Sequence, residues 1–386
     1  MKSYLSSKVE QLKPSGIRRF FDLANSLEGV ISLGVGEPDF ITPWSICQAS
    51  IKSIKNGFTS NTEMEGQAEL RQEISYYMKS RFQVSYSPST EIIVTIGGSQ
   101  ALDVSLRTIL NPGDEVLIIE PSYVAYGALV SLAGGKPVPI VTSFQNEFKP
   151  IPEQIKQSIS PRTKAIILCF PNNPTGTLLK KHELEAIADI ILENDLLVIT
   201  DEIYAELTYE EGAFCSIASL KGMRERTILV SGFSKGFAMT GWRLGYICAP
   251  EYLTQPMLEI IQHTTLGTSS ITQYGAIEAL RNGQRYIVEM RNSYRERRNF
   301  LVKQLNEMGL HCHLPEGAFY VFPSVRQTGL TSEQFAEKLL TQHKIAVVPG
   351  NAFGDSGEGY VRCSYATSME KLNEAMKRMR QFVETL

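Results

Sequence analysis

The sequence predicts an α/β protein with a large domain, a mainly parallel sheet covered by helices, and a small α+β domain after it. Short, continuous apolar runs recur through the middle of the 386-residue chain, with helix-like segments between several of them. Strands that are apolar throughout are typical of a parallel sheet with helices on both faces. Past residue 280 this alternation stops, and the chain is longer than one hydrophobic core usually organises.

Four apolar runs are the strands that we expect in the sheet: residues 115–119, 164–170, 196–200 and 227–230. A helix is predicted for residues 182–194, where Leu184 and Ile191 share one helix face. Strands that alternate with helices in this way form βαβ units, so we expect the strands to run parallel.

The C-terminal part is predicted to begin with a long amphipathic helix over roughly residues 281–309. We expect four further elements after it: a strand at 318–323, a helix at 332–340, a strand at 345–349 and a last helix from about Ser368. No Gly/Ser-rich linker separates the two parts of the chain, so we expect them to be docked against each other.

Composition argues against several classes of function. Hydrophobic residues make up 43% and charged residues 20% of the chain, and the net charge of -3 gives no basic surface for nucleic acid. No apolar run is long enough to span a membrane, and the N-terminus lacks an export signal. The six cysteines are scattered and include no Cys-x-x-Cys pair, which favours reduced thiols. We therefore expect a cytoplasmic protein that binds neither nucleic acid nor membrane.

Polar or reactive side chains follow all four expected strands, at the end where each strand finishes. Tyr123 follows the first strand and Asn173 the second. Asp201 and Tyr204 follow the third, and Lys235 follows the fourth. Ligands of such sheets bind in the crevice beyond the carboxyl ends of the strands. The sequence therefore predicts one site that combines aromatic rings, an amide, a carboxylate and an amine.

These groups together are the ones that bind pyridoxal phosphate. An amine can form an imine with the cofactor's aldehyde, a carboxylate can keep the ring nitrogen protonated, and an aromatic ring can stack on the cofactor. Gly97 and Gly98, followed by Ser99, precede an expected helix N-terminus that can bind the phosphate. Arg243 can add a charge-assisted, bidentate contact.

Taken singly, these residues also have ordinary structural explanations. Lys235 could be a solvated loop lysine, and Arg243 and Arg362 could make surface ion pairs. Asp201 could cap a helix, Tyr123 could simply pack, and the PNNPTG segment could be only a turn. Their joint placement after successive strands is what favours a site.

Two other ligand classes fit less well. The GVGEPD segment at residues 34–39 lacks the third glycine of a dinucleotide-binding fingerprint. Adjacent residues on a strand point to opposite faces, and His311, Cys312 and His313 have no matching pair of ligands elsewhere. We therefore expect no metal site and interpret these three side chains as strand packing.

The order of short motifs along nearly the full chain resembles that of the class I aminotransferases of fold type I. The motifs are GVGEPDF, GQAELR, TIGGSQAL, NPGDEV, PSYVAY, PNNPTG, DEIY, SGFSKGFAMTGWRLGY, GAFYVFP and YVRCSYA. The likeness is greatest to the bacterial subgroup of aromatic and N-acetyl-diaminopimelate aminotransferases. It implies a pyridoxal phosphate enzyme with a seven-stranded sheet in a large domain of residues 46–280. Residues 1–45 and 281–386 would form the small domain.

The resemblance implies a role for each residue of the cofactor site. Lys235 stands where the family has its Schiff-base lysine, and Arg243 where it has the phosphate-binding arginine. Asp201 matches the acid that faces the ring nitrogen. Tyr204 and Asn173 match the groups that hydrogen-bond the ring oxygen.

Further residues of the implied site bind the cofactor or the substrate. Tyr123 matches the stacking ring, and the rest of the cofactor-binding set is Gly98, Ser99, Gln100 and Ser234. Arg362 matches the arginine that takes the substrate's α-carboxylate, with the Gly36 backbone closing over it and Asn173 beside it. Ile17 would form an apolar wall for the substrate side chain, whereas Arg18 would meet an acidic one.

One position departs from the family pattern. Relatives commonly carry a tyrosine five residues before the glycine of GxxELR, where it reaches the cofactor phosphate of the neighbouring subunit, but this chain has Asn61 there. An amide still donates a hydrogen bond but is shorter than a phenol. A homodimer remains the expectation, but the contact of this side chain with the cofactor phosphate of the neighbouring subunit is put in doubt.

The implied reaction moves an amino group from an L-amino acid to a 2-oxo acid, with 2-oxoglutarate as the expected acceptor. Lys235 would act as general base and acid at Cα, assisted by Asp201 and Tyr204. Aromatic, N-acylated diamino acid, alanine and acidic donors all remain open. The alternative is β-elimination (C–S lyase chemistry) on the same fold. A cofactor-sensing regulator is disfavoured, because we expect no room for a DNA-binding segment before the resemblance begins near residue 15.

Overall fold

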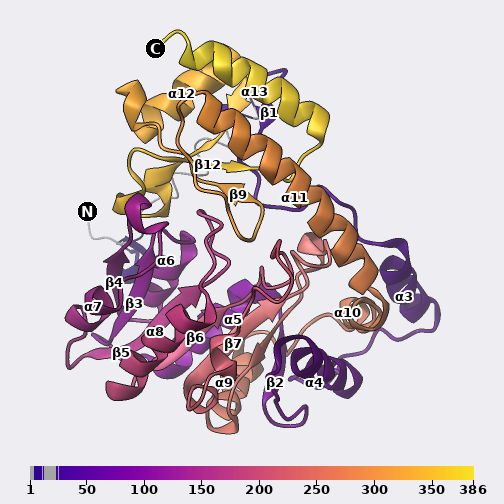
Figure 1. The fold of residues 1–386 in the computed structure, drawn as a ribbon. Helices are drawn as coiled ribbons and strands as arrows, with labels where there is room; N and C mark the ends of the chain where they lie inside the picture. Colours follow the sequence, from indigo (N-terminus) through magenta and orange to yellow (C-terminus); the bar gives the residue numbers. More distant parts are fainter. Residues whose placement is uncertain (1–3, 11, 13–22, 25) are drawn as a thin grey trace.

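The computed structural model describes residues 4–10, 12, 23–24 and 26–386. Its central feature is a seven-stranded sheet in the order β2-β8-β7-β6-β5-β3-β4 (Figure 1). The strands are β2 (Ile92–Thr95), β3 (Glu115–Glu120), β4 (Lys136–Val141), β5 (Thr163–Cys169), β6 (Leu197–Asp201), β7 (Thr227–Gly232) and β8 (Gly245–Cys248). All neighbouring pairs from β4 to β7 are parallel, and β8 runs antiparallel to both β2 and β7. The predicted mainly parallel α/β sheet is confirmed.

Helices cover both faces of this sheet, which explains why its strands are apolar throughout. Along β5, Ala165 and Ile167 pack into a core with α5, α6 and α9, whereas Ile166 and Leu168 pack into another core with α7 and α8. The helices from α1 to α10 are α1 (Ser7–Glu10), α3 (Trp44–Lys55), α4 (Ala68–Phe82), α5 (Gly97–Ile109), α6 (Ala125–Leu132), α7 (Pro152–Gln157), α8 (Lys181–Glu193), α9 (Glu251–Thr264) and α10 (Ser270–Asn282). Burying both faces of each strand is the main source of stability that the pattern encodes.

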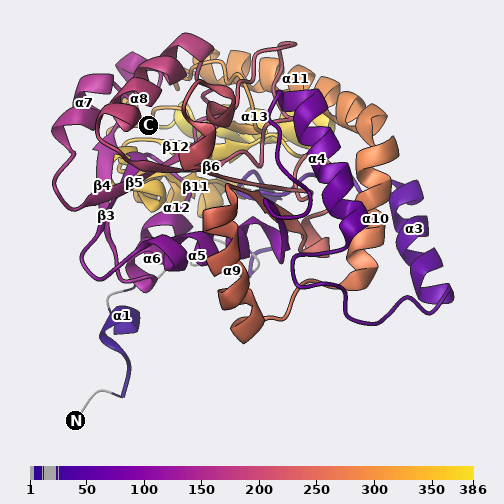
Figure 2. The same ribbon diagram turned by 90° about the horizontal axis from the view of Figure 1, so that it is seen from below.

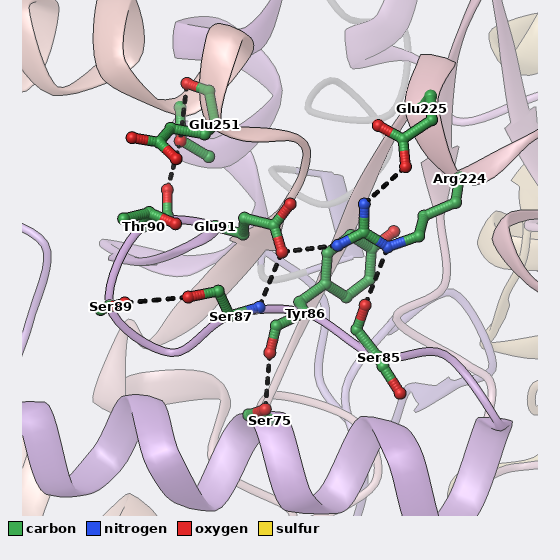
Figure 3. A network of polar contacts seen from close by, with 11 residues as sticks. Ser75, Ser85, Tyr86, Ser87, Ser89, Thr90, Glu91, Arg224, Glu225 and Glu251 are labelled. Carbon is green, nitrogen blue, oxygen red and sulfur yellow. Dashed lines mark hydrogen bonds and ion pairs between the residues drawn. The ribbon is translucent and has the colours of Figure 1, made fainter.

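The helices α3, α4 and α10 pack together at one end of the molecule (Figure 2). Their side chains continue the core beneath β2 and β8, where Ile46 and Ile74 are fully buried. Arg224 ties the loop before β2 to the turn before β7 through hydrogen bonds to Ser85 and Glu91 (Figure 3). This end of the sheet is therefore held by both packing and a polar network.

The C-terminal part stands over the carboxyl ends of the parallel strands (Figure 1). It comprises α11 (Gln284–Glu307), β9 (Tyr320–Val321), α12 (Ser332–His343), β10 (Ile345–Ala346), β11 (Val348–Pro349), β12 (Val361–Ser364) and α13 (Met369–Val383). β12 pairs antiparallel with β11 and β9. The strand β1 (Ile31–Ser32) from the N-terminal segment pairs in parallel with β10. The domain boundaries at residues 45/46 and 280/281 stay a prediction.

Three expectations for the C-terminal part need correction. The long helix begins at Gln284, because α10 ends just before Gly283, where a Cβ would come within 2.3 Å of the Ala279 carbonyl oxygen. The expected strand at 318–323 shortens to β9, and the one at 345–349 splits into β10 and β11, which pair in different sheets. These short strands are set by their partners, which local sequence does not reveal.

The segment His311–His313 is not a strand. Cys312 is buried, and the His313 ring stacks on Phe144 with a centroid distance of 4.0 Å. His313 Nε2 also lies 2.7 Å from the Phe144 carbonyl oxygen. The packing role that we expected therefore holds for Cys312 and His313, on an irregular segment, and is wrong for His311, which is exposed.

None of the described helices combines the length and the apolarity that crossing a lipid bilayer requires.

Candidate active site

A cavity of about 840 Å³ lies where the carboxyl ends of the parallel strands meet the C-terminal part. It brings together side chains from β3, β5, β6 and β7 exits and from β9 and β12. The predicted site residues that line it are Gly36, Gly98, Ser99, Tyr123, Asn173, Asp201, Tyr204, Ser234, Lys235, Arg243 and Arg362. Sheet topology brings the residues after β3, β5, β6 and β7 together, and docking of the C-terminal part adds Gly36 and Arg362, which lie more than 300 positions apart in sequence.

Lys235 lies in the loop after β7, with its amine inside the cavity. Its Nζ donates a hydrogen bond to the Gly36 carbonyl oxygen at 2.5 Å. Burial lowers the pKa of Lys235 to about 8, with the Glu37 and Asp201 carboxylates opposing and the Arg362 and Arg243 guanidiniums assisting that shift. A pKa near 8 leaves a useful fraction of the amine neutral near neutral pH, as a nucleophile or base requires.

Asp201 is the last residue of β6 and is buried at the floor of the cavity. Its Oδ2 accepts a hydrogen bond from the Tyr126 hydroxyl at 2.8 Å, and its Oδ1 accepts one from the Ile203 amide at 3.2 Å. Burial raises the pKa of Asp201, although these two bonds and the Lys235 charge oppose the rise. A protonated ring nitrogen is the kind of cation that would stabilise this buried carboxylate.

The N-terminus of α5 and Arg243 form a corner suited to an anion. No side chain caps this 13-residue helix, and Gly98 and Ser99 in its first turn line the cavity. A Cβ on Gly97 would lie 2.9 Å from Arg243 Nη2, and Gly97 has a φ of +71°, so glycine suits this position on both counts. Free helix N–H groups beside a guanidinium are a typical phosphate site.

Arg362 on β12 is 4% exposed, although it takes part in none of the ion pairs found among the described residues. Its Nη1 donates to Asn173 Oδ1 at 2.9 Å and its Nη2 to the Gly34 carbonyl oxygen at 2.7 Å. Its Nε is buried and has no hydrogen-bond partner among the residues that the structure describes. A buried guanidinium with neutral partners and an unused donor is suited to receive a carboxylate.

The two remaining predicted aromatic residues, Tyr123 and Tyr204, both line the cavity. Tyr204 is buried, which raises the pKa of its phenol well above the usual value. Its hydroxyl lies 2.9 Å from that of Tyr320. Tyr123 packs edge-on against Tyr126, with ring centroids 5.5 Å apart.

Some predicted residues lie elsewhere. Gln100 uses its side chain to accept from the Ile96 amide at 2.7 Å and to donate to Thr265 Oγ1 at 2.7 Å, and it does not line the cavity. Asn61 is exposed and is also absent from the lining. Ile17 and Arg18 lie outside the residues that the structure describes.

Two tyrosines that the sequence did not single out also line the cavity, Tyr126 and Tyr320. Tyr126 stands three positions after Tyr123 at the start of α6, a spacing that places two side chains on one helix face and was the available signal. Tyr320 comes from the two-residue strand β9. Its contact with Tyr204 spans 116 residues and has no local signal.

The donor set of the cavity fits pyridoxal phosphate. Three groups of the described residues match its aldehyde, ring nitrogen and phosphate: a buried amine, a buried carboxylate with no directly bonded cation, and an uncapped helix N-terminus beside Arg243. Lys235, Asp201 and Arg243 would hold it.

Comparisons with known proteins agree with this geometry. Residues 28–379 match the family model "Aminotransferase class I and II". A Bacillus subtilis protein named "Putative aminotransferase YugH" is 56% identical over 99% of each chain. The aromatic-amino-acid aminotransferase 2 of Thermococcus litoralis is 45% identical over 98% of each chain. The crystal structure of an aromatic aminotransferase from Pyrococcus horikoshii superposes with a TM-score of 0.91 at 44% identity, covering 95% of this chain and 99% of that one.

A match over most of the chain, and relatives of this identity, establish the family. The resemblance read from the motifs is confirmed, as are the seven-stranded fold and the cofactor class. The chain belongs to the class I and II aminotransferases and is a pyridoxal phosphate-dependent enzyme that transfers amino groups.

Proposed function

We propose that this aminotransferase takes the amino group from an L-amino acid with an aromatic side chain and passes it to 2-oxoglutarate. Two relatives at 44–45% identity are named for aromatic amino acids and one at 46% is named for aspartate, so the charges that line the cavity have to separate these donors. Within the described part of one subunit, the cations that line the cavity are Lys235, Arg243 and Arg362, and each already has a task. The carboxylate of Glu37 also lines it, which disfavours an acidic side chain.

The substrate's α-carboxylate would bind Arg362. The guanidinium is already oriented by Asn173 and the Gly34 carbonyl, so little side-chain entropy is lost on binding. Arg362 Nη2 would then donate to the substrate carboxylate instead of the Gly34 carbonyl. The hydrogen bond becomes stronger, because its acceptor is charged rather than neutral. Carboxylate binding at this point would direct the substrate's Cα toward Lys235.

Lys235 would carry the proton. When the cofactor is bound, the neutral Nζ of Lys235 would remove the Cα proton and return it to the C4′ carbon of the cofactor, so that one amine serves as base and then as acid. The pKa of about 8 brings the amine close to neutral pH, where both protonation states are accessible. The Gly36 carbonyl, which accepts from Nζ in this structure, would hold the amine beside the reacting carbon.

Pyridoxal phosphate, when bound, supplies an aldehyde and a ring that accepts electrons from Cα. Asp201 would keep the ring nitrogen protonated, since the buried carboxylate gains its missing cation there. Tyr204 and Asn173 would donate hydrogen bonds to the ring oxygen, and Tyr123 would stack on the ring. The placement of Lys235 in one cavity with Asp201 and Arg362 is the observation that carries this proposal.

We also propose that the enzyme works as a homodimer in the cytoplasm. Large apolar side chains are exposed around α3 and the loop after α9: Ile41 (91%), Trp44 (64%), Ile54 (52%), Phe58 (49%) and Leu266 (61%). Exposed apolar side chains gathered over one region mark protein interfaces. The described cysteines are all free, as a reducing compartment favours.

A panel of amino donors with 2-oxoglutarate tests the proposed specificity. Phenylalanine and tyrosine should give the highest kcat/KM, above N-acetyl-LL-diaminopimelate, alanine and aspartate. A higher kcat/KM for N-acetyl-LL-diaminopimelate, alanine or aspartate would overturn the aromatic assignment. Release of ammonia and a keto acid from a β-substituted donor, with no 2-oxo acid added, would instead indicate elimination.

A further inference from the structure

Tyr320 joins the two halves of the candidate active site. Its hydroxyl lies 2.9 Å from that of Tyr204, which follows β6. Its ring lies 4.4 Å from the guanidinium carbon of Arg362 on β12. Tyr320 itself is 1% exposed, so both contacts are made out of water, where such interactions are strongest.

The Tyr320 ring packs against the guanidinium of Arg362. A second ring, that of Phe353, lies 4.9 Å from the same guanidinium carbon. Aromatic rings stack on the planar guanidinium group, so these contacts help to keep its N–H groups directed at Asn173 and the Gly34 carbonyl. The orientation that receives the substrate carboxylate therefore depends on the Tyr320 ring.

The Tyr320 hydroxyl has a separate task. A phenol carries one proton and can accept through its oxygen. If the Tyr320 hydroxyl donates to Tyr204, the Tyr204 proton is left for a partner inside the cavity. A Cβ on Gly36 would lie 2.9 Å from the Tyr320 hydroxyl oxygen, so glycine there leaves room for this hydroxyl.

We infer that Tyr320 is a positioning residue with two separable parts: its hydroxyl directs the Tyr204 proton toward the cofactor, and its ring fixes the plane of Arg362 for the substrate carboxylate. The inference rests on the proposed function of this site. It links Tyr204 and Arg362, the predicted cofactor and substrate contacts, through one side chain.

Two substitutions separate these parts. Y320F removes the hydroxyl and keeps the ring, and Y320L removes both. The first readout is the pH at which the visible absorption of the cofactor-loaded enzyme titrates. The second is the Kd of 3-phenylpropionate, a carboxylate that has an aromatic group and no amine. Neither readout depends on turnover.

In Y320F, we expect the titration midpoint to rise by about 0.5–1 pH unit, because a weaker hydrogen bond from Tyr204 stabilises the charged ring oxygen less. The Kd of 3-phenylpropionate should stay within about twofold, since the ring remains over Arg362. In Y320L, the midpoint should rise equally and the Kd should increase about tenfold, the loss expected from a buried cation–ring contact.

Y365F is the matched control. Tyr365 is buried and its hydroxyl lies 2.8 Å from that of Tyr209, but it does not line the cavity. Both readouts should match the wild type. An unshifted midpoint in Y320F, or wild-type affinity for the probe in Y320L, overturns the inference. If the leucine variant does not fold, Y320F alone decides, because an unshifted midpoint is sufficient to refute it.

A different result would refute the proposed function. A wild-type enzyme that prefers non-aromatic donors would refute the aromatic assignment, while the comparison of Tyr320 variants would still report on the cofactor and carboxylate sites.

Discussion

At the scale of single residues, two adjacent acids at the end of β6 should differ sharply in importance. Asp201 lines the cavity, whereas Glu202 does not. The Glu202 carboxylate instead accepts hydrogen bonds from the Ser216 hydroxyl at 2.7 Å and the Thr200 hydroxyl at 3.2 Å. Burial raises the pKa of Glu202 to about 8, so this side chain is mostly neutral at pH 7 and glutamine resembles it closely.

Asp201→Asn removes a charge that the protonated ring nitrogen needs, and we expect kcat/KM to fall by about 100-fold or more. Glu202→Gln should leave kcat/KM within about threefold, since it replaces a neutral group by a neutral group. Steady-state kinetics at pH 7 measures both. An equal loss in the two variants would mean that the charge of Asp201 is not what the reaction uses.

The lysine of the site should destabilise the cofactor-free protein. Because burial lowers the pKa of Lys235 to about 8, the folded protein holds a disfavoured charge below that pH. Lys235→Met should therefore raise the free energy of unfolding at pH 7 by up to about 3 kcal/mol. This gain in the free energy of unfolding is fully present below pH 8. It vanishes as the pH rises toward about 10.4, the pKa of a lysine in the unfolded chain.

Urea unfolding of cofactor-free protein at pH 7 and pH 10 measures this effect. Lys338→Met, on the exposed side of α12, is the control for replacing a lysine by methionine and should change the free energy of unfolding by less than about 0.5 kcal/mol. A gain for Lys235→Met that grows between pH 7 and pH 10 would contradict the lowered pKa.

At the scale of elements, Arg224 fastens the edge of the sheet (Figure 3). Its guanidinium donates to Glu91 at 2.5 Å and to the Ser85 carbonyl at 2.9 Å, and it lies 5.0 Å from the Tyr86 ring centroid. These contacts bind the loop before β2 to the turn before β7, next to the strand that leads to Lys235.

Arg224→Ala should reduce the free energy of unfolding by about 1–2 kcal/mol, a moderate value because the side chain is 33% exposed. Arg107→Ala removes an exposed pair with Asp103 within α5 and should cost less than about 0.5 kcal/mol. Chemical denaturation compares the two. Equal losses would mean that the Arg224 network contributes no more than a surface ion pair.

The sequence predicts four strands that are buried on both faces, and it misses the largely exposed edge strand β4 and the two-residue strands, for a physical reason. The apolar runs that became β3, β5, β6 and β7 are buried on both faces, so their composition alone marks them. The two-residue strands β9, β10 and β11 depend on partners distant in sequence. Their positions follow from tertiary pairing, which no local pattern encodes.

The same distinction applies to the candidate active site. Lys235, Asp201 and Asn173 follow strands directly, so the topology of a parallel sheet predicts their convergence. The contact between Tyr320 and Tyr204 joins β9 to the segment after β6 and follows only from how the C-terminal part docks. The direction of the Gln100 side chain, toward Thr265, is likewise a tertiary outcome.

At the scale of the whole molecule, the exposed apolar side chains around α3 predict that one copy binds another. Ile41 is 91% exposed, and a charge there should disrupt a packed interface. Ile41→Asp should shift the protein from dimer to monomer at micromolar concentration, as sedimentation velocity measures. Leu314→Asp, at a site that is 53% exposed in the C-terminal part, should remain dimeric. A wild type that sediments as a monomer would refute the homodimer.

The central claim, that the Lys235 amine is the group joined to pyridoxal phosphate, has one direct test. The cofactor-loaded enzyme is reduced with borohydride, digested and analysed by mass spectrometry. We expect the pyridoxyl phosphate mass on the side chain of Lys235. The same mass on a different lysine, or on none, would contradict it.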